Sequence, residues 1–429
     1  MSPSDMSTTQ NSGSGEGHLA PDDQLVLPQS YADMASLHAL FAHFRAHDPI
    51  HWTKPQMFRP FWSLFRHGDI LEIEKRHDIF LNAPRTQLTS IESEDMVMRV
   101  TGGSHILLRT LVHMDDPDHA RFRLLTQSWF MPPNLKRLEA RIADMAREHV
   151  RHMRDLGDAC DFVREVAVYY PLRVIMHVMG LPPEDEPQML RLTQEIFAPT
   201  DPDLRRDDSS EAILATVQEL FTYFNAITED RRQNPRDDVC SVIANAQVDN
   251  APIGHLEAMS YYIIIATAGH DTTSSTTAGG LAALIDHPEQ LTRLQAEPDL
   301  LPNAVEEMFR LVTPVRHFMR TATQDYPLRD KWIRAGDALC LYYPSANRDE
   351  TVFSDPDMFK IDRPNLKHLA FGHGAHICLG MHLARMEIKA LFRELLPQIR
   401  SIESSGPRQE TASNFVGGLK SLPIRIQWQ

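Results

Sequence analysis

The sequence predicts a mainly helical fold with small β-sheets. Amphipathic helical patterns cover most of the chain, whereas strand-like stretches are short and scattered, at "FWSLF" from residue 61, "DALCLYYPS" from residue 337 and "LPIRIQW" near the C-terminus. The pattern shows no regular alternation of strands and helices. That argues against a doubly wound α/β fold and against an α/β barrel.

Three segments carry the clearest helical patterns. Residues 132–157 predict one amphipathic helix that stops at Gly157, and residues 209–233 predict a second. Residues 288–313 predict two short helices, the last of which ends before Pro314 because the residue before a proline is disfavoured in a helix. The apolar positions of the first segment are Leu135, Leu138, Ile142, Met145 and Val150.

The chain length of 429 residues allows either two domains or one large enzyme fold, since single cores usually stop growing at about 250–300 residues. Residues 1–25 are rich in Ser, Gly and Thr and predict a flexible N-terminal tail. The folded part is therefore expected to span residues 26–429.

Charge and hydropathy exclude several partners. Lys and Arg number 43 and Asp and Glu 58, and the resulting charge of −15 repels phosphate backbones, so we expect no nucleic acid. No apolar run approaches the roughly 18–20 residues that span a bilayer, so we expect no membrane insertion. The four cysteines are far apart and the first twenty residues are polar, which predicts a reducing, cytoplasmic location.

The stretch "FGHGAHICLGMH", residues 371–382, raises the question of a metal site. His373, His376, Cys378 and His382 could together bind zinc, although their spacing differs from that of common zinc fingers. The glycines in this stretch imply a backbone that turns sharply and approaches something closely. A helical pattern follows at once, so its N-terminal amides would favour a thiolate at Cys378. A surface loop around a buried cysteine is the plain alternative.

The same stretch resembles the cysteine-ligand signature of the cytochrome P450 haem-thiolate monooxygenases, F-G-x-G-x-H-x-C-x-G. The resemblance implies that residues 26–429 form one such domain, with Cys378 as the axial ligand of the iron of haem b. It also implies that Phe371 and His376 contact the haem, with His376 at a propionate, and that His373 and His382 are not ligands. All six fixed positions match: Phe371, Gly372, Gly374, His376, Cys378 and Gly380.

Residues 263–280, "IIIATAGHDTTSSTTAGG", place a carboxylate beside a hydroxyl within a buried-helix pattern. Thr and Gly are poor mid-helix residues, which suggests a helix opened locally for a ligand. The alternative is a Thr-rich helix whose hydroxyls bond back to carbonyl groups. The segment resembles the oxygen-binding helix of the P450 family. By that resemblance Thr272 binds O2 by a hydrogen bond and Asp271 relays protons.

Two further groups follow from the resemblance. Glu307 and Arg310 have the spacing of a helical ion pair, which alone would be a solvated surface pair; with Arg363 they resemble a structural network behind the haem. His119, Arg123 and Arg320 resemble the groups that, with His376, bind the haem propionates. Ordinary surface charges are the alternative for these three.

Four segments, "LPQSYAD", "ATAGHDTTSS", "YPSANRDE" and "NFVGG", resemble the soluble bacterial P450 proteins that hydroxylate α-terpineol. We expect a mostly apolar substrate pocket and hence a compact hydrophobic substrate, a monocyclic terpenoid or an aromatic or alicyclic hydrocarbon. Ordinary core is the alternative for each pocket residue. The expected pocket residues are Ile264, Thr267, Ala268, Phe318, Phe415 and Val416, with residues about 85–110 and 190–210 covering them.

The resemblance also implies that the reaction consumes O2 and two electrons from a [2Fe–2S] ferredoxin with its reductase. Arg385, Lys389 and Arg393 fall four apart on one helix face and could attract an acidic partner, although a solvated face explains them equally well. Two other functions stay open at this point. One is a zinc metalloprotein that uses the histidine cluster, and the other is a haem-binding protein without turnover.

Overall fold

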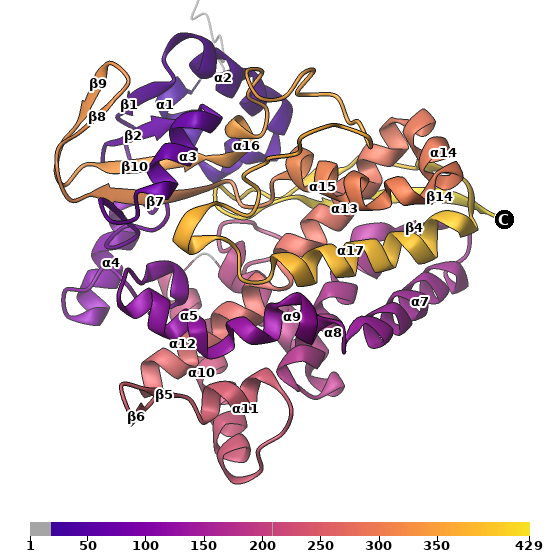
Figure 1. Ribbon diagram of the computed structural model, residues 1–429, viewed down its shortest axis with the longest axis horizontal. Coiled ribbons are helices and arrows are strands. Elements are labelled where there is room, and N and C mark those ends of the chain that lie inside the picture. Colours follow the sequence, from indigo (N-terminus) through magenta and orange to yellow (C-terminus); the bar gives the residue numbers. More distant parts are fainter. Residues whose placement is uncertain (1–18, 208) are drawn as a thin grey trace, which may run out of the picture.

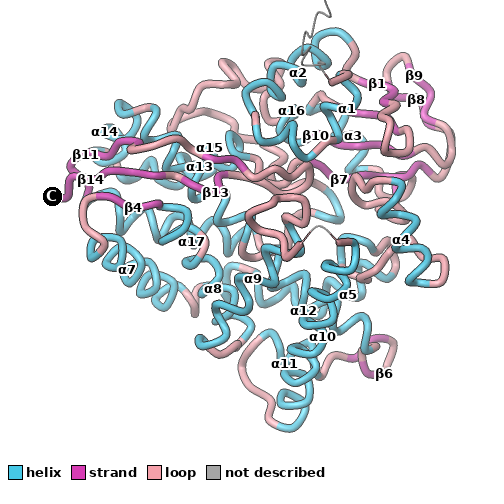
Figure 2. Tube along the Cα trace, turned by 180° about the vertical axis from the view of Figure 1, so that it is seen from behind, coloured by secondary structure: helices cyan, strands magenta, loops and turns pink. Residues whose placement is uncertain are grey.

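The computed structural model describes residues 19–207 and 209–429 (Figure 1). Helices make up most of the fold, which confirms the predicted class. Both views place a five-stranded sheet and a three-stranded sheet at opposite ends of the molecule, with α13, α15 and α17 near the middle (Figures 1 and 2). The three strand-like stretches of the sequence are strands β2, β10 and β14.

The α-helices are α1 Pro21–Val26, α2 Met34–His47, α3 His67–Lys75, α4 Ile91–Thr101, α5 Asp118–Gln127, α6 Pro132–Leu135, α7 Glu139–Asp155, α8 Tyr169–Met179, α9 Glu186–Phe197, α10 Ser210–Gln233, α11 Val239–Ala244, α12 His255–Ala268, α13 Asp271–Asp286, α14 Pro288–Ala296, α15 Leu301–Val312, α16 Tyr343–Ala346 and α17 Met381–Leu395. The strands are β1 Ile50–Thr53, β2 Phe61–Leu64, β3 Phe80–Leu81, β4 Ala159–Asp161, β5 Gln247–Val248, β6 Ala251–Pro252, β7 His317–Ala322, β8 Tyr326–Leu328, β9 Lys331–Ile333, β10 Ala338–Tyr342, β11 Ile399–Ser404, β12 Gln409–Glu410, β13 Leu419–Ser421 and β14 Pro423–Trp428.

The larger sheet has the strand order β1-β2-β10-β7-β3. Strand β10 is buried along its whole length and pairs parallel with β2 and antiparallel with β7. Side chains alternate between the two faces of a strand, so Phe318 and Arg320 of β7 share one face while His317 and Met319 share the other. The sheet thereby brings an aromatic side chain and a cation to the same side.

The main hydrophobic core lies among the helices. It includes Ile142 of α7, Ile263 of α12, Leu281 of α13, Met308 of α15 and Leu391 of α17. Helix α17 packs against both α7 and α15. The helix that follows Cys378 is therefore held by apolar contacts on two sides, which fixes the position of its N-terminus.

The predicted helix over residues 132–157 is interrupted, which corrects the sequence-based interpretation. It divides into α6 and α7, because the amides of Arg137 and Leu138 donate to carbonyls three residues back, at 3.2 and 2.9 Å, instead of four. The predictions for residues 209–233 and 288–313 are confirmed by α10, and by α14 and α15.

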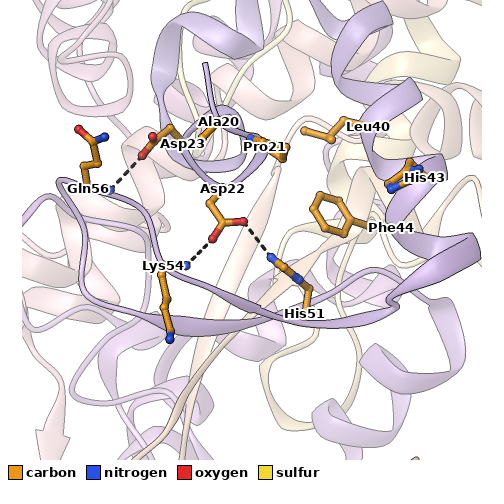
Figure 3. Close-up of a pocket in the computed structure, with 10 residues that line it drawn as sticks. All are labelled: Ala20, Pro21, Asp22, Asp23, Leu40, His43, Phe44, His51, Lys54 and Gln56. Carbon is orange, nitrogen blue, oxygen red and sulfur yellow. Dashed lines mark hydrogen bonds and ion pairs between the residues drawn. The ribbon is translucent and has the colours of Figure 1, made fainter. Parts of the chain in front are cut away.

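The N-terminal tail expected over residues 1–25 lies only partly within the described residues, and its described end is folded. Leu25 and Val26 of α1 are fully buried, and the hydroxyls of Tyr31 and Tyr342 donate to the Leu25 carbonyl at 2.8 and 3.1 Å. Figure 3 shows Asp22 of α1 between Lys54 and His51, beside a surface pocket of about 380 Å³. These contacts place the start of the folded part before residue 26.

None of the helices in the described ranges is long and apolar enough to cross a membrane.

Candidate active site

The loop before α17 holds Cys378 by its own backbone. The Cys378 amide donates to the carbonyl of Phe371 at 2.9 Å, which closes the loop. Gly372 and Gly374 have φ angles of +65° and +71°, a conformation that favours glycine. A Cβ at Gly374 would collide with the carbonyl oxygen of Glu74 near the end of α3. The glycines thus allow this loop to approach α3 closely.

The surroundings of Cys378 act on its thiol in two opposite directions. Burial raises the pKa of the thiol, while the amides of Gly380 and Met381 and the cations Arg123 and Arg385 act in the opposite direction. The amide donors come from the first turn of α17, as the sequence predicts. Arg385 also lies over the ring of Phe371, 4.4 Å from its centroid.

The histidines around Cys378 do not form a zinc site. Within the described ranges, no three His, Cys, Asp or Glu side chains are placed to hold a metal ion together. The ring of His376 instead lies against that of His119, with centroids 3.9 Å apart. The zinc interpretation therefore loses its geometric basis, and His373 and His382 are left without a shared ligand role.

A group of basic side chains, two of them buried and two half-buried, lies next to the cysteine loop. His119 and Arg320 are buried, and Arg123 donates to the carbonyl of Ile377 at 2.8 Å. Burial and then the nearby His119, Arg320 and Arg123 lower the pKa of His376 to about 2. We call His119, Arg123, Arg320 and His376 the basic cluster. The structure brings together all four side chains that the sequence assigns to the haem propionates.

Two carboxylates lie beside the basic cluster, and neither pairs with Arg123. Glu74 Oε1 lies 3.6 Å from Arg320 Nη2, and Asp116 Oδ1 lies 3.8 Å from His119 Nδ1. Among the residues that the structure describes, Arg123 forms no ion pair. Burial raises the pKa of Glu74 to about 7, and its Oε2 is buried without a hydrogen bond. The cluster therefore fits a ligand that brings its own carboxylates, such as haem.

The predicted opening of the long helix falls between α12 and α13. At residues 269 and 270 the helical ladder is disturbed, and the His270 amide reaches the carbonyl of Thr267 at 3.3 Å. The hydroxyl of Thr272 donates to the Ala268 carbonyl at 3.0 Å, so the back-bonding alternative holds as well. Asp271 Oδ2 is buried and has no hydrogen bond. The acid and the alcohol thus lie at an irregular point of the helix.

Glu307, Arg310 and Arg363 form a fully buried ion network, so a solvated surface pair is excluded. Arg310 donates to both oxygens of Glu307 at 2.7 and 2.8 Å, and Arg363 Nε donates to both at 3.0 Å. Arg310 also donates to the carbonyls of Asn347 and Pro356. The Asn347 side chain in turn accepts from the Leu369 amide at 2.7 Å, which ties the network to the start of the cysteine loop.

Comparison with known proteins decides the family. The model of the family described as Cytochrome P450 matches residues 92–428. The chain belongs to the cytochrome P450 family. It is similar to "Cytochrome P450-terp" of Pseudomonas sp, with 41% identity over 94% of this chain and 96% of that protein. "Linalool 8-monooxygenase" of Pseudomonas putida is 29% identical over 90% and 95% of the two chains.

Solved structures agree with this assignment. CYP108D1 from Novosphingobium aromaticivorans has a TM-score of 0.89 and 42% identity, over 95% of this chain and 98% of the other. Mycobacterium marinum CYP268A2, solved in complex with pseudoionone, has a TM-score of 0.85 and 29% identity, over 92% and 95%. The chain is thus a P450 monooxygenase, an oxidoreductase of a family that uses haem-thiolate iron, O2 and redox partners.

The pocket residues expected for this P450 fall into two groups. Ile264 and Ala268 share a helix face with Thr272. Ile264 is partly exposed, and Ala268 is exposed. Phe318 and Phe415 meet edge to face, with ring centroids 5.5 Å apart. Thr267 and Val416 do not join these residues at an accessible surface, because both are buried. Thr267 donates to the Ile263 carbonyl, and Val416 forms a β-bridge with Val315.

Sequence reasoning missed three residues of this P450 site. Phe197, at the end of α9, has its ring centroid 6.3 Å from that of Phe415. Phe197 lies in the range of about 190–210 that the sequence predicts to cover the pocket. Its aromatic side chain at a helix end is the feature that could have identified it. Glu74 had no local signal, because Arg320 is distant in the sequence, and the sequence does not reveal the contact of His270 with Thr193, which is 77 residues away. Glu74 faces the basic cluster, and His270 lies between Asp271 and α9.

Proposed function

We propose that this P450 monooxygenase hydroxylates a compact hydrophobic molecule, a monocyclic terpenoid or an aromatic or alicyclic hydrocarbon. The observation that carries the proposal is the apolar character of the residues expected to line the pocket. Ile264 and Ala268 share the helix face of Thr272, and Phe318 and Phe415 pack together. Such surfaces select for shape and apolar area. Two relatives are named for, or were solved with, terpenoid compounds, linalool and pseudoionone.

In this proposal the chain positions haem b and controls protons. Cys378 provides the thiolate, helped by the amides of Gly380 and Met381. The basic cluster would hold the two propionates, and the Glu307 network fixes the start of the cysteine loop through Asn347. When bound, the haem supplies the chemistry that inserts one atom of O2 into a C–H bond. Asp271 and Thr272 supply the proton-transfer groups, an acid and a hydroxyl next to each other at the helix opening.

The substrate class can be tested by titration. We expect monocyclic terpenoids and small hydrocarbons to shift the Soret band of the ferric protein, and turnover with O2 to yield alcohols, identified by mass spectrometry. The absorbance of the reduced, carbon monoxide-treated protein provides the control for thiolate-bound haem. If no compound of these classes shifts the band, the substrate proposal is refuted. A shift with every compound and product from none would favour the binding protein without turnover.

We also propose a [2Fe–2S] ferredoxin as electron donor, with the protein in the cytoplasm. A surface pocket of about 640 Å³ lies between α17 and the α6–α7 segment, lined by Lys136, Lys389 and Arg393 among others. Arg385 contributes less charge than expected, because it pairs with both oxygens of Glu306 at 2.6 and 2.8 Å. Burial alone would raise the pKa of the Glu306 carboxyl. Hydrogen bonds from His368 and Arg385 outweigh that effect and lower this pKa to about 2.

Charge reversal tests this partner surface. The double variant Lys389→Glu with Arg393→Glu should slow reduction by an acidic ferredoxin about tenfold at low salt, because steering depends on charge, and less at high salt. Lys331→Glu on β9, at the other end of the molecule, is the control and should leave the rate unchanged (Figure 1). Equal rates for the double variant and the native protein at low salt would exclude the surface.

A further inference from the structure

His317 is a fully buried histidine on β7. Its ring forms hydrogen bonds to the backbone of two segments that are far apart in the sequence. The amide of Leu88 donates to Nε2 at 2.9 Å, and Nδ1 lies 2.9 Å from the carbonyl oxygen of Asn414. The ring thus bridges the segment that precedes α4 and the turn that precedes β13.

The two contacts define the tautomer of the ring. A backbone amide only donates, so Nε2 accepts and carries no hydrogen, whereas a carbonyl oxygen only accepts, so Nδ1 donates to Asn414. Burial lowers the pKa of His317 to about 4, although the bond to Asn414 acts in the opposite direction, and the ring is therefore neutral at neutral pH. Among the described residues, neither backbone group has another hydrogen-bond partner. Loss of the ring would leave the Leu88 amide and the Asn414 carbonyl unpaired.

Both bridged segments also lie against β7, so the ring stands between them. On one side the Met319 amide donates to the carbonyl of Thr86 at 2.8 Å. On the other side Val315, just before β7, forms a β-bridge with Val416. Each of these attachments reaches one segment, whereas the ring of His317 joins the two segments to each other.

The aromatic side chains expected to line the pocket lie next to this bridge. The ring centroid of Phe415 lies 5.6 Å from that of His317 and 5.5 Å from that of Phe318. Phe318 shares its face of β7 with Arg320 of the basic cluster, so it lies on the side of the proposed haem site. The segment at Leu88 leads into α4, within the residues expected to cover the pocket. The aromatic side and the covering segment of the expected pocket therefore meet at one histidine.

We propose that His317 is a positioning residue for substrate selection: its neutral ring holds the Leu88 segment and the Phe415 turn at a fixed separation. The inference rests on the proposed apolar pocket beside the haem and deepens it, because it names a residue that sets the pocket size without touching the substrate. A preorganised surface loses little affinity to rearrangement when a ligand binds. Loss of the bridge should therefore weaken a ligand that fills the pocket more than it weakens a small one.

Nitrogen NMR tests the tautomer in the absence of substrate. Holoprotein labelled with ¹⁵N in its 21 histidines is measured in the diamagnetic carbon monoxide-bound state, and the variant His317→Phe assigns the signals. At neutral pH we expect Nδ1 of His317 to carry a hydrogen and Nε2 to give the signal of a bare acceptor. The opposite tautomer, or a ring with hydrogen on both nitrogens, would overturn the inference.

Two ligands of different size test the positioning role. Imidazole and 4-phenylimidazole both bind haem iron through a ring nitrogen, and the Soret band follows their binding. We expect His317→Phe to weaken 4-phenylimidazole about tenfold and imidazole less than about twofold, because the energy lost with a buried hydrogen bond corresponds to about the larger factor. His149→Phe is the matched control, because His149 is also a buried histidine, bonded to the Met145 carbonyl on α7. It should leave the ratio of the two affinities unchanged.

A fall in both affinities by the same factor would assign His317 a structural role alone and refute the inference. If His317→Phe retains no haem, His317→Asn decides the question. Asn retains a donor near the place of Nδ1 and lacks an acceptor near the place of Nε2, so the affinity ratio should still change, and a native ratio would refute the inference. Neither ligand is a proposed substrate. The ratio therefore decides the inference even if no terpenoid or hydrocarbon shifts the Soret band and the substrate proposal fails.

Discussion

Two groups of charged side chains, one fully buried and one partly buried, differ in how their charges are paired. The network of Glu307, Arg310 and Arg363 is closed, because each guanidinium bonds to the carboxylate and to backbone carbonyls. The basic cluster is open: among the described residues Arg123 has no carboxylate partner, and Glu74 beside the cluster keeps one oxygen unbonded. A buried charge group that is complete within the chain supports the fold, whereas an incomplete one favours a charged ligand.

The largest effect should come from breaking the closed network. Glu307→Gln leaves two buried guanidinium groups without their carboxylate, a change that costs about 3–5 kcal/mol in comparable buried pairs. We expect the free energy of unfolding in urea to fall by that amount and haem retention to fall with it. The surface variant Glu297→Gln, which removes an exposed helical ion pair with Arg293, is the control and should change little. Near-native stability of Glu307→Gln would show that the network is dispensable.

Removing a cation from the basic cluster should not lower the stability of the haem-free protein, in contrast to breaking the Glu307 network. Arg123→Gln removes a half-buried cation that has no carboxylate partner among the described residues, so protein free of haem should keep its stability or gain some. Holoprotein should lose haem to a scavenging globin at least about tenfold faster, because a hydrogen bond to a charged group is worth about 1.5–3 kcal/mol. Unchanged haem loss would remove Arg123 from the propionate site.

Glu74 gives the cluster a pH dependence. Its pKa is raised from 4.5 to about 7 in the folded protein, so the folded state binds the extra proton and stability falls as pH rises from about 4.5 to about 7. Glu74→Gln mimics the protonated acid. We expect haem-free Glu74→Gln to match the native protein near pH 5 and to exceed it by about 1–3 kcal/mol at pH 8.

Urea titrations of both proteins at the two pH values measure this difference. Because histidines also titrate in this range, only the difference between the two proteins is informative. A constant difference would mean that Glu74 does not carry the proton.

The smallest effects belong to the histidines outside both groups. His373→Ala and His382→Ala should leave haem content and the thiolate spectrum unchanged, because neither side chain shares a metal-binding group within the described ranges. His376→Ala, in the basic cluster, is the comparison and should lower haem content. Loss of haem from either of the first two variants would reopen the question of their role.

Local sequence spacing predicts much of this site. Three features can each be recognised within a segment of a few residues. They are the fixed positions around Cys378, the acid–alcohol pair at residues 271 and 272, and the spacing of Glu307 and Arg310. Features that depend on distant contacts could not be predicted. The Glu306–Arg385 pair joins residues 79 apart, and Glu74 meets Arg320 of β7. The interruption between α6 and α7 arises from turn hydrogen bonds that an amphipathic pattern does not reveal.

Helix α1 has a consequence for how the chain is made. Its carbonyls at Leu25 and Val26 accept hydrogen bonds from Tyr342 and Asn414, which lie 317 and 388 residues later. Because a ribosome makes the chain from its N-terminal side, α1 is synthesised hundreds of residues before these partners exist. The edge formed by α1, β10 and the turn at Asn414 can therefore be completed only after Asn414 has been added to the chain.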